Sequence, residues 1–313
     1  MRERNQPVVR PIGTDRSTFA GITLTTRQPT PVLRHVRQRK VRVVSIYLMI
    51  ALALAPFLLP LYWLLIGVFK TPADLVHTPP FWFPPSWTFS NVEQLFTNSG
   101  SAILLYARNS LEIAVFTVVA TVVASSLAAY GFSQFEFRGR DALFWIVIIT
   151  LIVPSWATIV PQYQLFSWLH WVGTLRPLMF PYVTGDPFSI FLLRQYMLTV
   201  PRSLKEAAEC DGASELRIWW SIVMPMAKPA VAVAGVFAFI NSYNAFFGPL
   251  IYLTNPGDYT LPLGVYEFIG LHGSLDVAQI VPYTVIVVLP LIVVFAVAQR
   301  QIIKGVRLGG AFR

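Results

Sequence analysis

Charged residues are scarce in this chain. Only 12% of its 313 residues are Asp, Glu, Lys or Arg, whereas 55% are hydrophobic. A soluble domain carries roughly a quarter charged residues, because these side chains keep its surface in water. The composition therefore excludes an ordinary soluble domain and predicts a protein embedded in lipid.

Cysteine and the common catalytic motifs are also missing. The single Cys210 excludes an internal disulfide, and the four histidines show no metal-ligand spacing. The sequence has no Gly-x-x-x-x-Gly-Lys-Ser/Thr phosphate loop, and no segment between its apolar runs is long enough for a nucleotide-binding domain. We therefore predict a chain that is not an enzyme and holds no metal or cofactor, so that any ATP hydrolysis occurs on another chain.

The sequence does contain six long apolar runs. The first, Ser45 to Phe69, has 25 residues without a charge, more than the about 20 that a helix needs to cross a bilayer. The others cover about 113–132, 142–160, 178–193, 229–253 and 280–298. Backbone groups in lipid must be hydrogen-bonded internally, and the runs are too long for barrel strands. The predicted fold class is thus an all-α integral membrane protein with six transmembrane helices.

The basic residues predict the orientation. If the N-terminus is cytoplasmic, the segments on that side hold 21 of the 24 Lys and Arg, as expected for cytoplasmic loops. Both termini are therefore predicted to be cytoplasmic, and the net charge of +9 reflects topology rather than nucleic-acid binding. Residues 1–43 are predicted to be a disordered basic tail, either an orientation signal, which we favour, or a contact with lipid headgroups. Residues 44–313 are the predicted membrane domain.

The loop 201–225 is predicted to be structured. Ser203 followed by Glu206 matches a capping box and predicts the start of a helix. Gly212 predicts its end, because glycine tolerates a left-handed backbone. A second short helix is predicted over 213–220, before Pro225 opens the next span.

This loop has the composition of a docking surface. Small residues allow another protein to approach closely, and Glu206, Glu209 and Asp211 offer acceptors to a basic partner. The alternative is an amphipathic helix lying on lipid, but three acids within six residues are unsuited to an anionic leaflet. The composition therefore favours docking to a protein.

The spacing within the loop is similar to a family motif. Glu206-Ala207-Ala208, Gly212, Ile222 and Met224-Pro225 resemble the E-A-A-x3-G-x9-I-x-L-P motif of ABC importer permeases, with Met224 in place of Leu. Asp211, Ala213, Ser214 and Lys228-Pro229-Ala230 resemble its carbohydrate-uptake branch, the maltose and glycerol-phosphate permease type. The likeness covers about residues 44–313.

The resemblance implies a permease subunit in a bacterial cell membrane. Its implied partners are a second homologous permease, a cytoplasmic ATPase dimer, an extracytoplasmic solute-binding protein and a carbohydrate. The residues implied to couple to the ATPase are Glu206, Ala207, Ala208, Asp211, Gly212, Ala213 and Pro225. The alternatives are an importer for peptides, polyamines or phosphate, and an ion-coupled secondary transporter, which should show paired intramembrane acids or inverted repeats.

Candidates for the solute path lie in the fourth and fifth runs. Asn241, Asn244 and Gly248 share a helical spacing, with Tyr243 adjacent. Amides and aromatic rings suit a sugar, but the same stripe would suit a hydrogen-bonded seam between helices. Asp186 is an ionisable residue inside an apolar run and is a further candidate, unless an irregular backbone leaves it in water.

Overall fold

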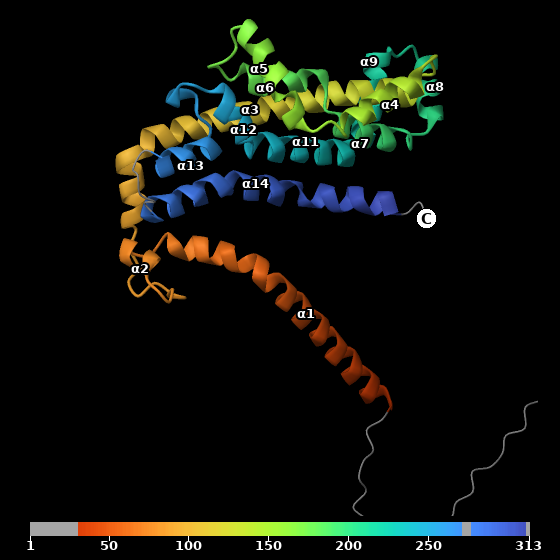
Figure 1. Cartoon of the computed structure of the whole chain (residues 1–313). Coiled ribbons are helices and arrows are strands. Elements are labelled where there is room, and N and C mark those ends of the chain that lie inside the picture. The colour runs from red at the N-terminus through yellow and green to blue at the C-terminus, as the bar shows by residue number, and fades with distance from the viewer. Residues whose placement is uncertain (1–30, 271–276, 311–313) are drawn as a thin grey trace, which may run out of the picture. The chain divides into compact units, whose positions relative to one another are not determined.

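Helices account for all regular structure in residues 31–270 and 277–310, which are the residues that the computed structural model describes (Figure 1). The predicted all-α fold is confirmed there. The long helices are α1 (Pro31–Gly67), α3 (Ser90–Gln134), α11 (Lys228–Tyr243) and α14 (Val277–Gly310). Helix α1 begins inside the predicted tail, so residues 31–43 are helical, while residues 1–30 lie outside the described range.

Three of the described helices are long and apolar enough to cross a membrane. These are α1 from Arg42, α3, and α14 as far as Arg300. The segment Glu215–Met226 together with α11 makes a fourth if this bent pair is one span. The chain is thus a multi-pass helical protein, and the number of six spans stays a prediction.

The other predicted runs are interrupted helices. The third comprises α4 (Arg140–Thr150), η1 (Ser155–Thr158) and α5 (Ile159–Trp168), and the fourth comprises α6 (Arg176–Met179), η2 (Phe180–Thr184) and α7 (Pro187–Met197). The fifth divides into α11 and α12 (Phe247–Tyr252). Proline explains the last break, because Pro249 has no N–H to donate to the carbonyl of Ala245.

Short elements connect these helices. They are α2 (Pro72–Val76), α8 (Arg202–Cys210), α9 (Glu215–Ile218), the π-helical η3 (Trp219–Val223), α10 (Met224–Met226), η4 (Pro256–Asp258) and α13 (Leu261–Gly270). The described residues up to Leu58 form one compact unit, and those from Leu59 onward form another. All the packing that positions the site lies within the second unit.

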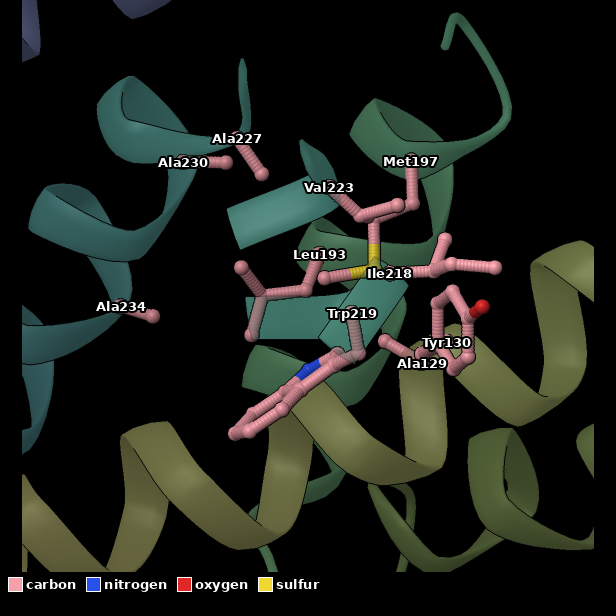
Figure 2. Packing of buried hydrophobic residues seen from close by; sticks show 10 residues of the cluster. All are labelled: Ala129, Tyr130, Leu193, Met197, Ile218, Trp219, Val223, Ala227, Ala230 and Ala234. Atoms are coloured by element: carbon pink, nitrogen blue, oxygen red, sulfur yellow. The ribbon is translucent and has the colours of Figure 1, made fainter. Parts of the chain in front are cut away.

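Helix α3 is central to this second unit, where it packs against α7, α11, α13 and α14. One cluster of buried residues joins α3 and α7 to the segment that runs from α9 to α11, and Figure 2 shows it. We call it the loop-base cluster; it comprises Ala129, Tyr130, Leu193, Met197, Ile218, Trp219, Val223, Ala227, Ala230 and Ala234. Because these side chains interdigitate, the loop 201–225 is held on the bundle rather than free in solvent.

Candidate functional site

Helix α8 begins at Arg202 with Pro201 as its N-cap, two residues before Ser203, which the predicted capping box places at the N-cap. No side chain caps it, and the N–H of Leu204 donates to the carbonyl of Pro201 at 3.2 Å. Ser203 is already the second helical residue, so its hydroxyl is not at the cap. The predicted capping box of Ser203 and Glu206 is therefore wrong, although the predicted helix is present.

The end of α8 is as predicted. Gly212 has φ +75°, a left-handed conformation that glycine adopts without steric cost. Its N–H donates to the carbonyl of Glu209 at 3.0 Å, and that of Ala213 donates to Ala208 at 2.9 Å. This pair of bonds is the Schellman motif, in which residues on either side of the turn also touch a common apolar surface. Ala208 and Ala213 do so by packing on the loop-base cluster.

The second half of the loop bends sharply into α11. The predicted helix over 213–220 begins at Glu215, after the N-cap Ser214, and continues through η3 and α10. The axis then turns by 85° between Met226 and Lys228. Pro225 therefore does not open the next span but lies just before the bend. Pro229 has no N–H to bond the carbonyl of Pro225, which weakens the helical ladder at this point.

A polar clamp fixes the inner face of α8. The side chain of Lys205 is only 14% exposed, and its Nζ lies 3.1 Å from a carboxylate oxygen of Glu215 and 3.5 Å from one of Glu209. The same Nζ lies 4.2 Å from the ring centroid of Phe135. From α3, the hydroxyl of Tyr130 donates to Glu215 at 2.5 Å. We call Tyr130, Lys205 and Glu215 the clamp; it joins α8 and α9 to the end of α3.

The clamp changes the acidity of Glu215. Burial alone would raise the pKa of this carboxyl, but the hydrogen bonds from Tyr130 and Lys205 and the charge of Lys205 outweigh it, so the pKa lies below its ordinary value. Glu215 is therefore ionised at neutral pH and accepts from both partners.

The outer face of α8 is available to a partner. Glu206, Ala207, Asp211 and Gly212 are exposed, and the side chains of Glu206 and Asp211 make no ion pair within the described part of the chain. Pro225 is also exposed, whereas Ala208 and Ala213 face inward. The seven predicted coupling residues thus divide into an outer group and two inward alanines that support it. Sequence spacing did not identify Tyr130, which lies far away in the chain.

Asp186 is placed as a helix cap. Its carboxylate accepts from the N–H of Ser189 at 2.8 Å and from the hydroxyl of the same residue at 2.7 Å. Its own N–H donates to Ser125 on α3 at 2.9 Å. Gly185, with φ +89°, provides the turn before it. These contacts explain a carboxylate at this position without a solute.

The predicted stripe on α11 does not form one surface. Tyr243 is 1% exposed, and its hydroxyl donates to the carbonyl of Val287 on α14 at 3.0 Å. This contact matches the alternative of a hydrogen-bonded seam between helices. Asn241 and Asn244 are exposed, with side chains that make no hydrogen bond among the described residues. Gly248 lies in α12, beyond the break that separates α12 from α11, so the helical spacing from Asn244 is interrupted.

Gly248 instead lines a cavity of about 400 Å³. Its walls come from α3, η1, α5, α6, η2, α11 and α12, together with the residues of the break before α12. Five aromatic residues surround it: Trp156, Tyr182, Phe246, Phe247 and Tyr252. Sequence spacing does not predict that these aromatics meet, because they belong to three separate apolar runs. The helix breakers Pro154, Pro181 and Pro249, one in each run, were the available signal.

A family model described as "binding-protein-dependent transport system inner membrane component" matches residues 120–308. The chain is 31% identical to the arabinooligosaccharides transport system permease protein of Bacillus subtilis, over 89% of this chain and 99% of the relative. It is 29% identical to the trehalose/maltose transport system permease protein of Thermococcus litoralis, over 88% of this chain and 97% of the relative.

Solved structures share the fold. One is a chain of a bacterial ABC transporter involved in the import of the acidic polysaccharide alginate, with a TM-score of 0.71 and 23% identity. The match covers 85% of this chain and 98% of that one.

Proposed function

The chain belongs to the family of binding-protein-dependent transport system inner membrane components, and we propose that it forms one half of the membrane pathway of an ABC importer for carbohydrates. As a permease it is not itself catalytic, and a separate subunit hydrolyses ATP. The relatives named for arabinooligosaccharides and trehalose/maltose support the carbohydrate class over peptides, polyamines and phosphate.

The outer face of α8 is the proposed docking surface for the ATPase. Glu206 and Asp211 offer unpaired carboxylates to basic groups of a partner, and Ala207 and Gly212 leave room for its backbone. This exposed acidic and small-residue surface, held rigid by a buried base, is the observation that carries the proposal. The full importer contains a second permease, an ATPase dimer and an extracytoplasmic solute-binding protein.

The loop transmits movement of the ATPase in two directions. The clamp connects α8 and α9 to α3, and the 85° bend connects Glu215–Met226 to α11. When ATP draws the two ATPase subunits together, the docked loops move with them. Packed elements shift as units, so both α3 and α11 turn, and the pathway opens to the other side.

The proposed topology has six spans in the bacterial cell membrane, with both termini cytoplasmic. The interrupted third, fourth and fifth runs each complete one crossing. Non-helical backbone is tolerated at that depth where it is buried in protein or lines a cavity. Asn241, Asn244 and Gly248 remain candidates for the solute path, whereas the contacts of Tyr243 and Asp186 favour structural roles.

Gly212→Asp tests the docking surface. An added Cβ at Gly212 meets no atom within 4 Å, so the new side chain projects from the outer face while the fold pays only backbone strain of about 1 kcal/mol. We expect the variant to reach the membrane but to lose co-purification with the ATPase and solute uptake. Affinity purification in mild detergent and uptake in the native host measure both effects.

Gly139→Asp is the matched control. Gly139 has a similar φ of +87°, and an added Cβ there also meets nothing within 4 Å, but it lies at the start of α4. We expect this variant to retain the ATPase. If both variants lose the ATPase, the cause is the backbone strain of a non-glycine residue at positive φ rather than lost docking. If Gly212→Asp retains the ATPase, docking at this surface is refuted.

A further inference from the structure

We propose that the cavity beside Gly248 is a subsite for one ring of a neutral saccharide, located within this chain rather than supplied by its partner permease. The proposal rests on the proposed function, because it names the part of the chain that the carbohydrate contacts. The subsite includes Gly248 and is separate from Asn241 and Asn244, which do not line this cavity.

Interrupted helices meet at this cavity. Trp156 belongs to η1, Tyr182 to η2, and Phe246 to the break between α11 and α12. Figure 1 shows α5, α6 and α12 gathered at one end of α11. Backbone that leaves the helical ladder in a membrane is tolerated where it lines a cavity, and broken helices mark binding sites in transporters. Three breaks at one cavity are therefore more informative than any of them alone.

The lining has the chemistry of a sugar site. Flat rings cover the C–H faces of a pyranose. Trp156 and Phe247, which both line the cavity, meet edge to face with centroids 4.5 Å apart, so each ring fixes the orientation of the other. Hydroxyl and amide groups come from Tyr182, Ser242, Tyr252 and Gln162. The volume of about 400 Å³ falls within the range of about 300–1,000 Å³ for small-molecule sites.

Every lining residue is uncharged. The fifteen are Ile113, Trp156, Ile159, Gln162, Pro177, Leu178, Pro181, Tyr182, Ser242, Ala245, Phe246, Phe247, Gly248, Pro249 and Tyr252. Recognition of a phosphate or carboxylate uses Arg or Lys, and recognition of a polyamine uses acids. A desolvated charge without such a partner is costly, so this lining selects neutral solutes.

Tyr252 brings an unsatisfied polar group to the wall of the cavity. The residue is 5% exposed, and its hydroxyl is buried without a hydrogen-bond partner in the described part of the chain. A buried hydroxyl without a partner is costly. The hydroxyl of Tyr252 is closed off from solvent, so a small shift of the lining that let a sugar hydroxyl reach it would satisfy this group. The surrounding rings of Tyr163 and Phe166 hold the phenol in place, with centroids 6.1 and 5.4 Å from that of Tyr252.

Saturation-transfer NMR on the purified full importer, without the binding protein, tests the subsite. The probes are maltose, arabinotriose and galactobiose, with digalacturonate and glucose 6-phosphate as charged comparisons. We expect transfer to the C–H protons of at least one neutral probe and none to the charged ones. Tyr252→Phe should weaken binding about three- to tenfold, the effect of one neutral hydrogen bond, and Trp156→Ala should weaken it further.

Tyr163→Phe is the control, since this neighbouring tyrosine stacks on Tyr252 but does not line the cavity. Unchanged binding in both Tyr252→Phe and Trp156→Ala would overturn the subsite, and transfer to the charged probes alone would overturn its neutral character. Neither result would affect the carbohydrate proposal, which fails only if the importer takes up no saccharide in cells. Because Tyr252→Phe removes only a hydroxyl that has no partner among the described residues, a merely structural role of Tyr252 predicts no loss of binding.

Discussion

Tyr130 and Glu215 are separated by 85 positions in the sequence, and their hydrogen bond is the residue-scale link between the loop 201–225 and α3. A hydrogen bond to a charged acceptor contributes more than one between neutral groups. Glu215 keeps 43% of its side-chain surface exposed, so solvent reduces the contribution. We expect Tyr130→Phe to cost about 1 kcal/mol and to lower the apparent Tm of the detergent-purified protein by about 2–4 °C.

The pH dependence of this loss follows from Glu215. Its folded-state pKa is lowered, so its ionised form stabilises the fold above the ordinary carboxyl pKa of about 4.3, and this contribution is lost as the pH falls through the lower folded value. The difference in Tm between wild type and Tyr130→Phe should therefore persist from about pH 6 to 8. It should shrink in acid, below about pH 4. Tyr266→Phe, which alters an exposed tyrosine, should match wild type throughout; an equal loss in that variant would contradict the clamp.

At the scale of elements, α9 has one side in the loop-base cluster and the other in solvent. Ile218 is 0% exposed, whereas Leu216, two residues earlier, is 68% exposed. Ile218→Ala leaves a cavity in the support of α8 and should cost about 2–5 kcal/mol, but Leu216→Ala should stay within about 0.5 kcal/mol. Thermal unfolding of the two purified variants measures this difference.

Recovery of the ATPase provides a second readout for the same pair. We expect Ile218→Ala to lose the ATPase, because α8 no longer has a firm base. Leu216→Ala should retain it, because this exposed side chain is not part of the loop-base cluster. Equal Tm losses in the two variants would contradict the packing of α9.

At the scale of the whole molecule, Cys210 reports on topology. It is the only cysteine of the chain and is exposed on α8. With the docking loop cytoplasmic, a membrane-impermeant maleimide should label Cys210 in inside-out vesicles but not in intact cells. Bound ATPase should protect it.

An opposite-side control uses Cys210→Ser with Asn98→Cys, near the other end of α3, where the side chain is exposed. This variant should be labelled in intact cells. Labelling of wild type in intact cells would overturn the proposed orientation.

The sequence by itself determined that the chain lies in lipid, that it is helical, and that the loop 201–225 contains a helix ending before Gly212. Scarce charge and long apolar runs require a lipid-embedded helical chain, because unpaired backbone groups are too costly there. The end of α8 at Gly212 could also be predicted from neighbouring residues, since the left-handed residue after a helix is usually glycine. These properties depend on composition and on neighbours within a few residues.

The tertiary structure decided which residues of the loop are exposed, which support it and which surround the cavity. Ala207 and Ala208 are adjacent in the motif, but only Ala208 packs on the loop-base cluster. Tyr243 joins a seam with α14, and five aromatics from separate runs meet at one cavity. Such contacts join residues far apart in the chain, so their burial and direction depend on how the interrupted helices pack and could not be derived from local spacing.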